Sequence, residues 1–230
     1  MDPIKTFAAS SAFQLPLPVD DSKPLEHLFG VEEWTRFFGD VGEIPPLPKN
    51  IQDILSTPCP FVREKTIGET HLLVLMPAQV NGRPFNLNRL QKLIQQPREG
   101  KARDYAEDYQ TIKKDVGNLT IGSPYWLLMT SGILADSTSK DYESHCALLK
   151  SIAHTTGLSY TLPNALEAAT TILSHAHRGV TSFYSETFTR CQDAIGSGYV
   201  IVGGFTGETL TINRYSFAND TVGAAGVLRL

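Results

Sequence analysis

Apolar residues recur along this chain with two different periods, and the periods alternate. The runs 71–76 and 125–130 are short and almost continuously apolar, as expected for buried strands, and Pro77 ends the first of them. Between the two runs, Asn86 precedes an apolar stripe of helical spacing that Pro97 stops. This alternation predicts a mixed domain of helices and strands.

Two longer helices are predicted on either side of a short extended link. The first runs from about Lys140 to Thr156, with its N-cap supplied by the polar run 137–139, and Gly157 ends it. The second runs from Pro163 to Arg178 and is closed by Gly179. We therefore expect two helices joined at a left-handed glycine.

The C-terminal part of the pattern is β. We expect strands over 199–205, 209–217 and 223–230, separated by turns at Thr206-Gly207 and Asn219-Asp220. Glycine weakens a strand, so its repeated use there predicts bulges or a close backbone approach. These glycines are Gly203, Gly204, Gly223 and Gly226.

Prolines divide the chain into an arm and a body. Nine of the 14 prolines lie in the first 60 residues, which predicts an extended arm over 1–66 and a domain over 67–230. Short helices are expected in the arm at 24–38, which Gly30 can break in two, and at 50–55.

Three large aromatic residues in the arm need a partner surface: Trp34, Phe37 and Phe38. Packing on the body is the favoured interpretation. The alternative is a structural or assembly protein, in which Trp34 and Phe38 dock the arm on a neighbouring copy and form an oligomer. The segment 98–118 carries a mixed run of charges and is expected to be a charged insertion or loop with a solvated face.

Composition excludes several classes of protein. The chain has 230 residues, 41% hydrophobic and 19% charged, with a net charge of −4, so it lacks the basic footprint of a nucleic-acid-binding protein. The run 72–76 is too short for a membrane span, and the first ten residues do not resemble a signal peptide. We expect a cytoplasmic protein, or one exported without a cleaved signal peptide.

Candidate chemistry is sparse. Cys59, Cys146 and Cys191 are far apart and do not form a disulfide framework. Cys191 follows Arg190, which favours a thiolate, so a divergent enzyme using Cys191 with a nearby histidine from the pair 175/177 is one alternative function.

No metal or cofactor is predicted. His175 and His177 are two residues apart, which places them roughly 200° around a helix, unlike a zinc pair. Asn219 and Asp220 suit a turn better than a calcium site, and Gly196-Ser197-Gly198 is interpreted as a turn before a strand.

The order of these elements resembles a known family. The link 156–163 with Glu167 after it, then Val202-Gly203-Gly204-Phe205, Asn213-Arg214-Tyr215 and Gly226-Val227-Leu228-Arg229, is similar to the formylglycine-generating-enzyme (sulfatase-modifying-factor) branch of the C-type-lectin-like fold. The layout, arm included, also resembles that of bacterial proteins without an assigned function. The resemblance implies an α+β domain with two helices and a twisted, glycine-marked antiparallel sheet.

The departures from the family matter for function. The formylglycine-generating enzyme works through a cysteine pair close to its final strands, and this chain has no cysteine after Cys191. The sulfoxide-synthase relatives bind a metal through a His-x-x-x-His cluster, a spacing that is absent here. The resemblance therefore implies a divergent, non-catalytic member on a scaffold that is often used for binding.

These observations lead to a non-enzymatic binding module as the main hypothesis. Its ligand, a protein or a glycan, would bind the face of the last hairpin, where C-type-lectin-like folds often present their ligand surface. The opposing interpretation is that Tyr215 and Phe217 alternate into the core while their neighbours cover a surface. The candidate binding residues are Glu208, Asn213, Arg214, Tyr215, Phe217, Asn219 and Asp220.

Overall fold

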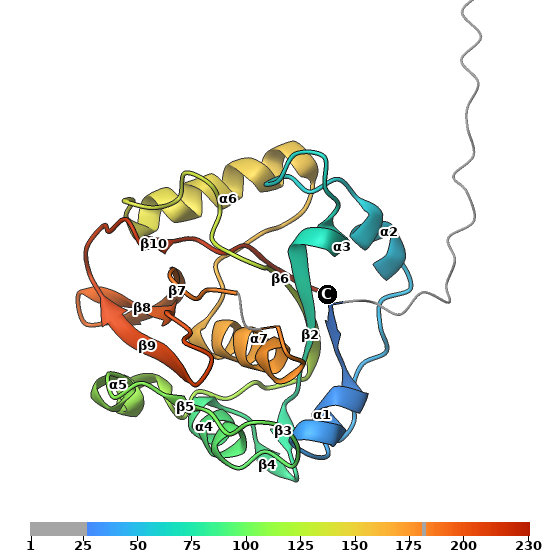
Figure 1. Cartoon of the computed structure of the whole chain (residues 1–230). Helices are drawn as coiled ribbons and strands as arrows, with labels where there is room; N and C mark the ends of the chain where they lie inside the picture. The colour runs from blue at the N-terminus through green and yellow to red at the C-terminus, as the bar shows by residue number, and fades with distance from the viewer. Residues whose placement is uncertain (1–26, 181–182) are drawn as a thin grey trace, which may run out of the picture.

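The computed structural model describes residues 27–180 and 183–230 of the chain. The first part of the proline-rich arm, including the predicted start of a helix at Pro24, lies outside the described residues. In the described part, two β-sheets lie on either side of one central helix, with further helices around them (Figure 1). The molecule is thus a mixed α and β protein.

The first sheet is built around the two apolar runs of the sequence. His71 lies opposite Thr130, and Met76 lies opposite Tyr125 in an antiparallel pair. The edge strand β1 runs parallel to its neighbour. The order is β1-β2-β6-β11, formed by β1 (Leu28–Phe29), β2 (His71–Met76), β6 (Tyr125–Thr130) and β11 (Val227–Arg229).

The second sheet contains the C-terminal hairpin. Its central strands are antiparallel, and its short edge strands pair in parallel. The close backbone approach predicted for the glycines is confirmed at Gly203, where a Cβ atom would lie 2.1 Å from the carbonyl oxygen of Thr187. The order is β10-β7-β8-β9-β5, formed by β10 (Val222–Gly223), β7 (Phe188–Ile195), β8 (Gly198–Gly203), β9 (Thr209–Tyr215) and β5 (Asp104–Tyr105).

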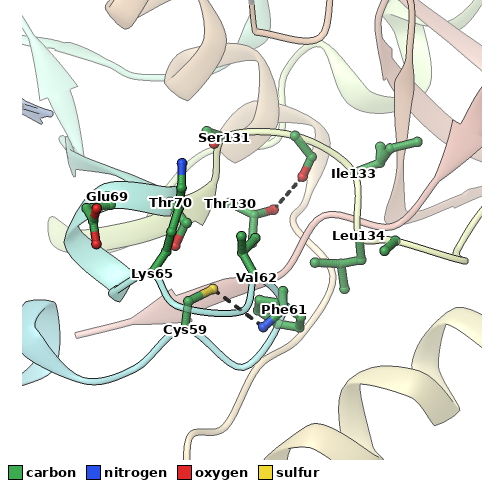
Figure 2. Close-up of a pocket in the computed structure, with 12 residues that line it drawn as sticks. Cys59, Phe61, Val62, Lys65, Glu69, Thr70, Thr130, Ser131, Ile133 and Leu134 are labelled. Atoms are coloured by element: carbon green, nitrogen blue, oxygen red, sulfur yellow. Dashed lines mark hydrogen bonds between the residues drawn. The ribbon is translucent and has the colours of Figure 1, made fainter.

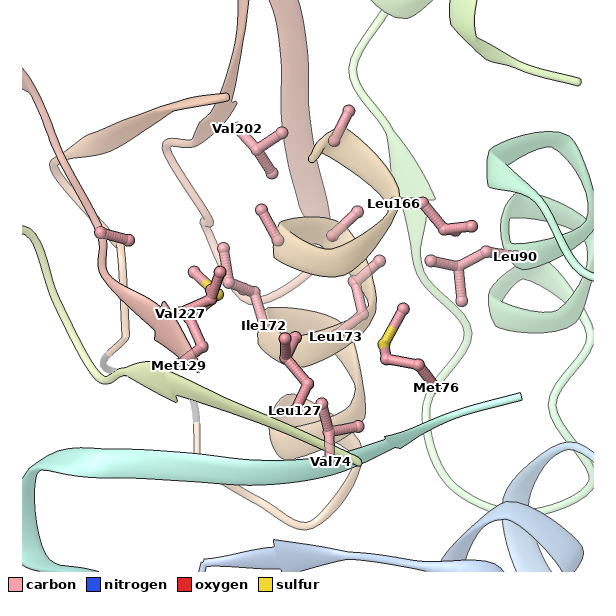
Figure 3. Packing of buried hydrophobic residues seen from close by; sticks show 14 of the residues in the cluster. Val74, Met76, Leu90, Leu127, Met129, Leu166, Ile172, Leu173, Val202 and Val227 are labelled. Carbon is pink, nitrogen blue, oxygen red and sulfur yellow. The ribbon is translucent and has the colours of Figure 1, made fainter. Parts of the chain in front are cut away.

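Helix α7 (Ala165–His177) fills the space between the two sheets, and all of its residues are buried. Ile172 and Leu173 point into an apolar core with Val74 and Leu127 of the first sheet and Val202 of the second (Figure 3). A helix packed between two sheets favours small residues, which explains its many alanines, and it also buries polar side chains such as those of Glu167 and His175. The core of the molecule is therefore centred on this helix.

The remaining elements cover the outer surfaces. The predicted cap at Asn86 is confirmed, since its side chain accepts a hydrogen bond from the amide of Arg89. The turn at Asn81-Gly82 joins a two-stranded hairpin. These elements are α1 (Val31–Phe37), α2 (Ile51–Ser56), α3 (Ile67–Thr70), α4 (Leu87–Gln95), α5 (Tyr109–Val116), α6 (Tyr142–Thr156), β3 (Gln79–Val80) and β4 (Arg83–Pro84).

Helix α6 confirms the predicted joint and corrects its start. Gly157 ends the helix in the left-handed conformation, with φ of 73°. The N-cap is Asp141 rather than a residue of 137–139, because Asp141 accepts a hydrogen bond from the amide of Ser144 at 2.8 Å. The polar residues 137–139 belong instead to the turns before the helix, and Ser137 among them is fully buried.

The predicted strand 223–230 is wrong as a single element. It forms β10 in the second sheet and β11 in the first, and the chain crosses between the sheets at Ala224-Ala225-Gly226. The strand β7, by contrast, is absent from the sequence prediction. The charged segment 98–118 is more than a loop, because it contains β5 and α5.

The aromatic residues of the arm pack on the body, as favoured above. Trp34 is fully buried, Phe37 is 5% exposed and Phe38 is 2% exposed. Trp34 Nε1 donates a hydrogen bond to the carbonyl oxygen of Leu75 in β2. Docking of Trp34 and Phe38 on a neighbouring copy is therefore incompatible with this structure, because their surfaces are already covered.

Candidate functional site

A pocket of about 350 Å³ opens where the C-terminal hairpin meets the start of α6. The turn between β7 and β8 and the end of β9 meet here, because Tyr199 pairs with Tyr215 and Ile195 with Gly198. This volume is in the range of small-molecule and cofactor sites. We call it the hairpin-end pocket, and it is lined by residues 141–143, 190, 194, 196–199 and 216.

Aromatic side chains form one wall and one edge of this pocket. The rings of Tyr142 and Tyr199 are stacked, with centroids 3.8 Å apart and an interplanar angle of 5°. Beyond them, Phe217 is 73% exposed and meets the ring of Tyr215 edge-on, at a centroid distance of 6.2 Å. The two stacked tyrosines are half-buried, so a concave polar surface here lies beside partly accessible rings, as in sites that bind ligands with both apolar and polar faces.

A buried guanidinium fixes the end of the hairpin under the pocket. Arg190 is 1% exposed, and its Nη2 and Nη1 donate to the carbonyl oxygens of Phe217 at 2.8 Å and Tyr215 at 3.4 Å. Burial lowers the pKa of Arg190, and the carboxylates of Asp141 and Glu143 oppose that shift. Arg190 therefore positions the segment that carries Phe217.

Polar groups line the rest of the pocket. Asp141 and Glu143 are exposed at the start of α6, and hydrogen bonds from Ser144 lower the pKa of Asp141, which keeps it ionised. Ser197 and Ser216 add hydroxyl groups from the opposite side. The pocket thus offers carboxylate acceptors and hydroxyl donors beside aromatic rings, an arrangement suited to binding a hydroxyl-rich ligand.

The structure brings part of the predicted binding face to this pocket. Arg214 is exposed, and its Nη1 would lie 3.2 Å from a Cβ atom placed on Gly196, in the pocket wall. Tyr215 is half-buried and Phe217 is exposed, so the interpretation that both alternate into the core is wrong for Phe217. Asn213 is a half-buried neighbour on β9.

The other predicted residues have different positions. Asn219 organises its own loop, since it donates to Tyr215 Oη at 3.0 Å and accepts from the amide and hydroxyl of Thr221 at 2.8 Å. Asp220 is an exposed residue of this turn. Glu208 lies at the opposite end of β9 and pairs with Lys101. In the described part of the chain, no group of three or more acidic, histidine or cysteine side chains could hold a metal ion.

Sequence reasoning missed the deeper half of the pocket. The sequence pattern gives Arg190 no role beyond that of a neighbour of Cys191. The stacked tyrosines lie on α6 and β8, which no local period connects. The glycine-rich turn 196–198 was a signal that could have located the pocket. It joins β7, which was not predicted, to β8, and so marks the end of a hairpin.

The cysteine and histidine candidates lie in the core. Cys191 is fully buried, and burial raises the pKa of its thiol well above the ordinary value. His175 is fully buried and His177 is 8% exposed, and burial lowers the pKa of both. A thiolate nucleophile needs a lowered pKa and access to substrate, so this geometry argues against a catalytic Cys191.

Figure 2 shows another cavity, of about 360 Å³, between the loop that carries Cys59, Val62 and Lys65 and the loop after β6. Its polar floor is already satisfied by protein groups. Thr130 Oγ1 donates to the carbonyl oxygen of Gly132 at 2.8 Å, and Thr70 Oγ1 donates to that of Thr66 at 2.8 Å. These two hydroxyl groups are therefore already engaged with the backbone, while Lys65 and Ser131 add further polar groups to the lining.

Within the described residues, no helix is long and apolar enough to cross a membrane. Comparisons with models of protein families, with curated proteins and with solved structures found no match to this chain. The site must therefore be interpreted from its own geometry.

Proposed function

We propose that this protein is a non-enzymatic binding module that recognises a glycan through the hairpin-end pocket. The observation that carries the proposal is the pocket itself, with the stacked rings of Tyr142 and Tyr199 beside the carboxylates of Asp141 and Glu143. A ring face that the stacking leaves uncovered can accept the C–H face of a sugar ring, while carboxylates and hydroxyls hydrogen-bond its hydroxyl groups.

A glycan is favoured over a protein ligand by the distribution of apolar surface. A stable protein interface buries about 800 Å² per partner around an apolar centre. In the described chain, the exposed large hydrophobic residues lie singly in separate segments, and Phe217 is the one next in sequence to a residue of the pocket lining, Ser216. A small concave site therefore suits a ligand of a few sugar units better than a broad protein surface.

We further propose that the scaffold is a divergent C-type-lectin-like domain of the formylglycine-generating-enzyme type. Two residues that carry the resemblance support it, because Glu167 and Arg229 form a bidentate ion pair at 2.6 and 2.7 Å. This pair ties the start of α7 to the final strand. The observed sheets contain parallel as well as antiparallel pairs, unlike the purely antiparallel sheet expected.

Glycan-array screening of the full chain, followed by titration of the glycans it captures, tests this function. We expect Glu143→Gln and Arg214→Ala each to weaken binding at least tenfold and Phe217→Ala to weaken it severalfold, because these side chains border the pocket and support no core packing. Leu119→Ala is the matched control, since Leu119 is also exposed, at 54%, and lies away from the pocket. Capture of no glycan, or equal binding by all variants, would contradict the proposal.

A further inference from the structure

Arg103 carries a buried positive charge with no carboxylate partner among the described residues. It is 8% exposed. Its Nη1 donates to the carbonyl oxygen of Lys101 at 3.0 Å and lies 3.2 Å from His177 Nδ1, and its Nη2 donates to the carbonyl oxygen of Ala176 at 2.9 Å. Its Nε has no hydrogen-bond partner in the described part of the chain and is closed to solvent, so a ligand in a neighbouring cavity would have to meet the Nη atoms.

This arrangement is costly unless an anion completes it. Arginine stays protonated in proteins, and a buried cation that is compensated only by neutral acceptors loses much of its hydration without regaining it. His177 does not supply the missing charge, because burial and the neighbouring Arg103 lower its pKa to about 4 and keep it neutral. The guanidinium of Arg103 therefore has neutral groups as its direct partners and no carboxylate in contact with it among the described residues.

The charged side chain lines a cavity of about 700 Å³, which lies apart from the hairpin-end pocket. We call it the basic cavity, and its other walls come from Lys101, residues 185–186 and the turn 205–208. Lys101 adds a second cation at the rim, where its Nζ pairs with Glu208 Oε1 at 3.1 Å. Both partners are about 70% exposed, so this pair contributes little and Lys101 can turn to a ligand.

We infer that the basic cavity binds a small molecule through a single oxyanion, a carboxylate or a phosphate, held between Arg103 and Lys101. The exposed carboxylates of Glu186 and Glu208 line the same cavity beside its two cations and repel a polyanion, which favours a ligand with one anionic group. Ser185, an exposed residue of the lining, adds a hydroxyl group, whereas the hydroxyl of Thr206 already bonds to Thr209. This inference is independent of the glycan proposal, because the two sites share no lining residue.

Thermal unfolding of the full chain, followed in acetate, glycine, phosphate or chloride at matched ionic strength, tests the inference. We expect a saturable rise in Tm with one of the first three probes and no such rise with chloride. The probe whose effect saturates identifies the anionic group of the ligand. Acetate would indicate a carboxylate, glycine a carboxylate beside an ammonium group, and phosphate a phosphate ester.

Variants locate the binding. Lys101→Ala and Ser185→Phe leave the hydrogen bonds of the Arg103 side chain intact, and each should raise the apparent Kd at least tenfold. The control Lys150→Ala removes an exposed charge on α6 and should leave the apparent Kd unchanged. Arg103→Met should abolish the effect, and if it fails to fold the other two variants decide. A Tm that rises linearly with every salt, or saturable binding that Lys101→Ala and Ser185→Phe retain, would overturn the inference.

Discussion

Arg229 neutralises a carboxylate that the fold buries completely. The side chain of Glu167 is 0% exposed and accepts hydrogen bonds from Arg229, from Tyr125 Oη at 2.6 Å and from the amide of Asn164 at 2.7 Å. We expect Arg229→Met to lower the free energy of unfolding by roughly 3 kcal/mol, because it leaves a buried carboxylate without its cation. Urea denaturation measures this loss.

The matched control is Arg36→Met, which breaks the exposed pair of Arg36 with Glu99 and should cost about 1 kcal/mol or less. Equal losses in the two variants would mean that the Glu167–Arg229 pair does not stabilise the fold.

His71 makes stability depend on pH. Burial lowers its pKa from 6.5 to about 4, while Thr70 and Tyr160 contact its two ring nitrogens. Between these pH values the unfolded chain binds a proton that the folded chain does not, so the free energy of unfolding falls as the pH drops from about 6.5 to 4.

The His71→Gln variant should therefore lose less stability over this pH range than the wild type. The control variant His154→Gln changes an exposed position of α6 and should follow the wild type. Urea denaturation at pH 7.5 and 4.5 measures the difference. Parallel curves for wild type and His71→Gln would contradict this assignment.

Thiol labelling separates the cysteines by exposure. Cys146 is half-buried on α6, whereas Cys191 is fully buried in β7 with a raised pKa. We expect a maleimide reagent to modify Cys146 well before Cys191 in the native chain, and both alike in urea, as read by mass spectrometry of peptides. Native labelling of Cys191 at the rate of a free thiol would revive the enzyme alternative.

At the scale of elements, the crossing between the two sheets is the part that the sequence pattern concealed. The amides of Ala224, Ala225 and Gly226 receive no partner from a sheet there. These amides donate instead to buried hydroxyl groups: that of Ala224 to Ser137 at 3.0 Å, that of Ala225 to Thr189 at 2.9 Å and that of Gly226 to Thr130 at 3.2 Å. Such long-range side-chain bonds leave no local period, which is why 223–230 resembles one strand.

Thr189→Val tests this crossing, because it keeps the shape of the side chain and removes the acceptor for the amide of Ala225. A buried unsatisfied amide costs about 1–3 kcal/mol, so we expect a loss of that size in urea denaturation. Thr211→Val, at a half-buried position of β9, should cost less than about 0.5 kcal/mol. A neutral Thr189→Val would show that the crossing does not depend on this hydroxyl.

Elements with a regular local signal were predictable. The strands 71–76 and 125–130 and the helix after Asn86 are confirmed, because apolar runs and caps are local properties. The strand β7 was not predictable in this way. A register shift between Arg190 and Ala194 breaks the alternation of its buried and exposed residues, and its polar residues resemble a surface segment.

At the scale of the whole molecule, α7 holds the two sheets together and so positions the hairpin. It contacts strands of both sheets, including β2 of the first and β8 of the second. Of the residues that the sequence singled out, Arg214 lies beside Gly196 and Phe217 follows Ser216 along the chain, but the lining itself consists of other residues. The sequence did not predict the base, because Arg190 and the start of α6 reach the pocket only through this packing.

The central claim is that ligand binds the hairpin-end pocket. Hydrogen–deuterium exchange of the full chain, with and without the glycan captured on an array, tests it most directly. We predict slower exchange confined to 141–144, 194–199 and 214–217, which form or border this pocket. Protection confined to 59–70 and 130–135, around the cavity of Figure 2, or to the basic cavity at 101–103 and 205–208, would contradict it.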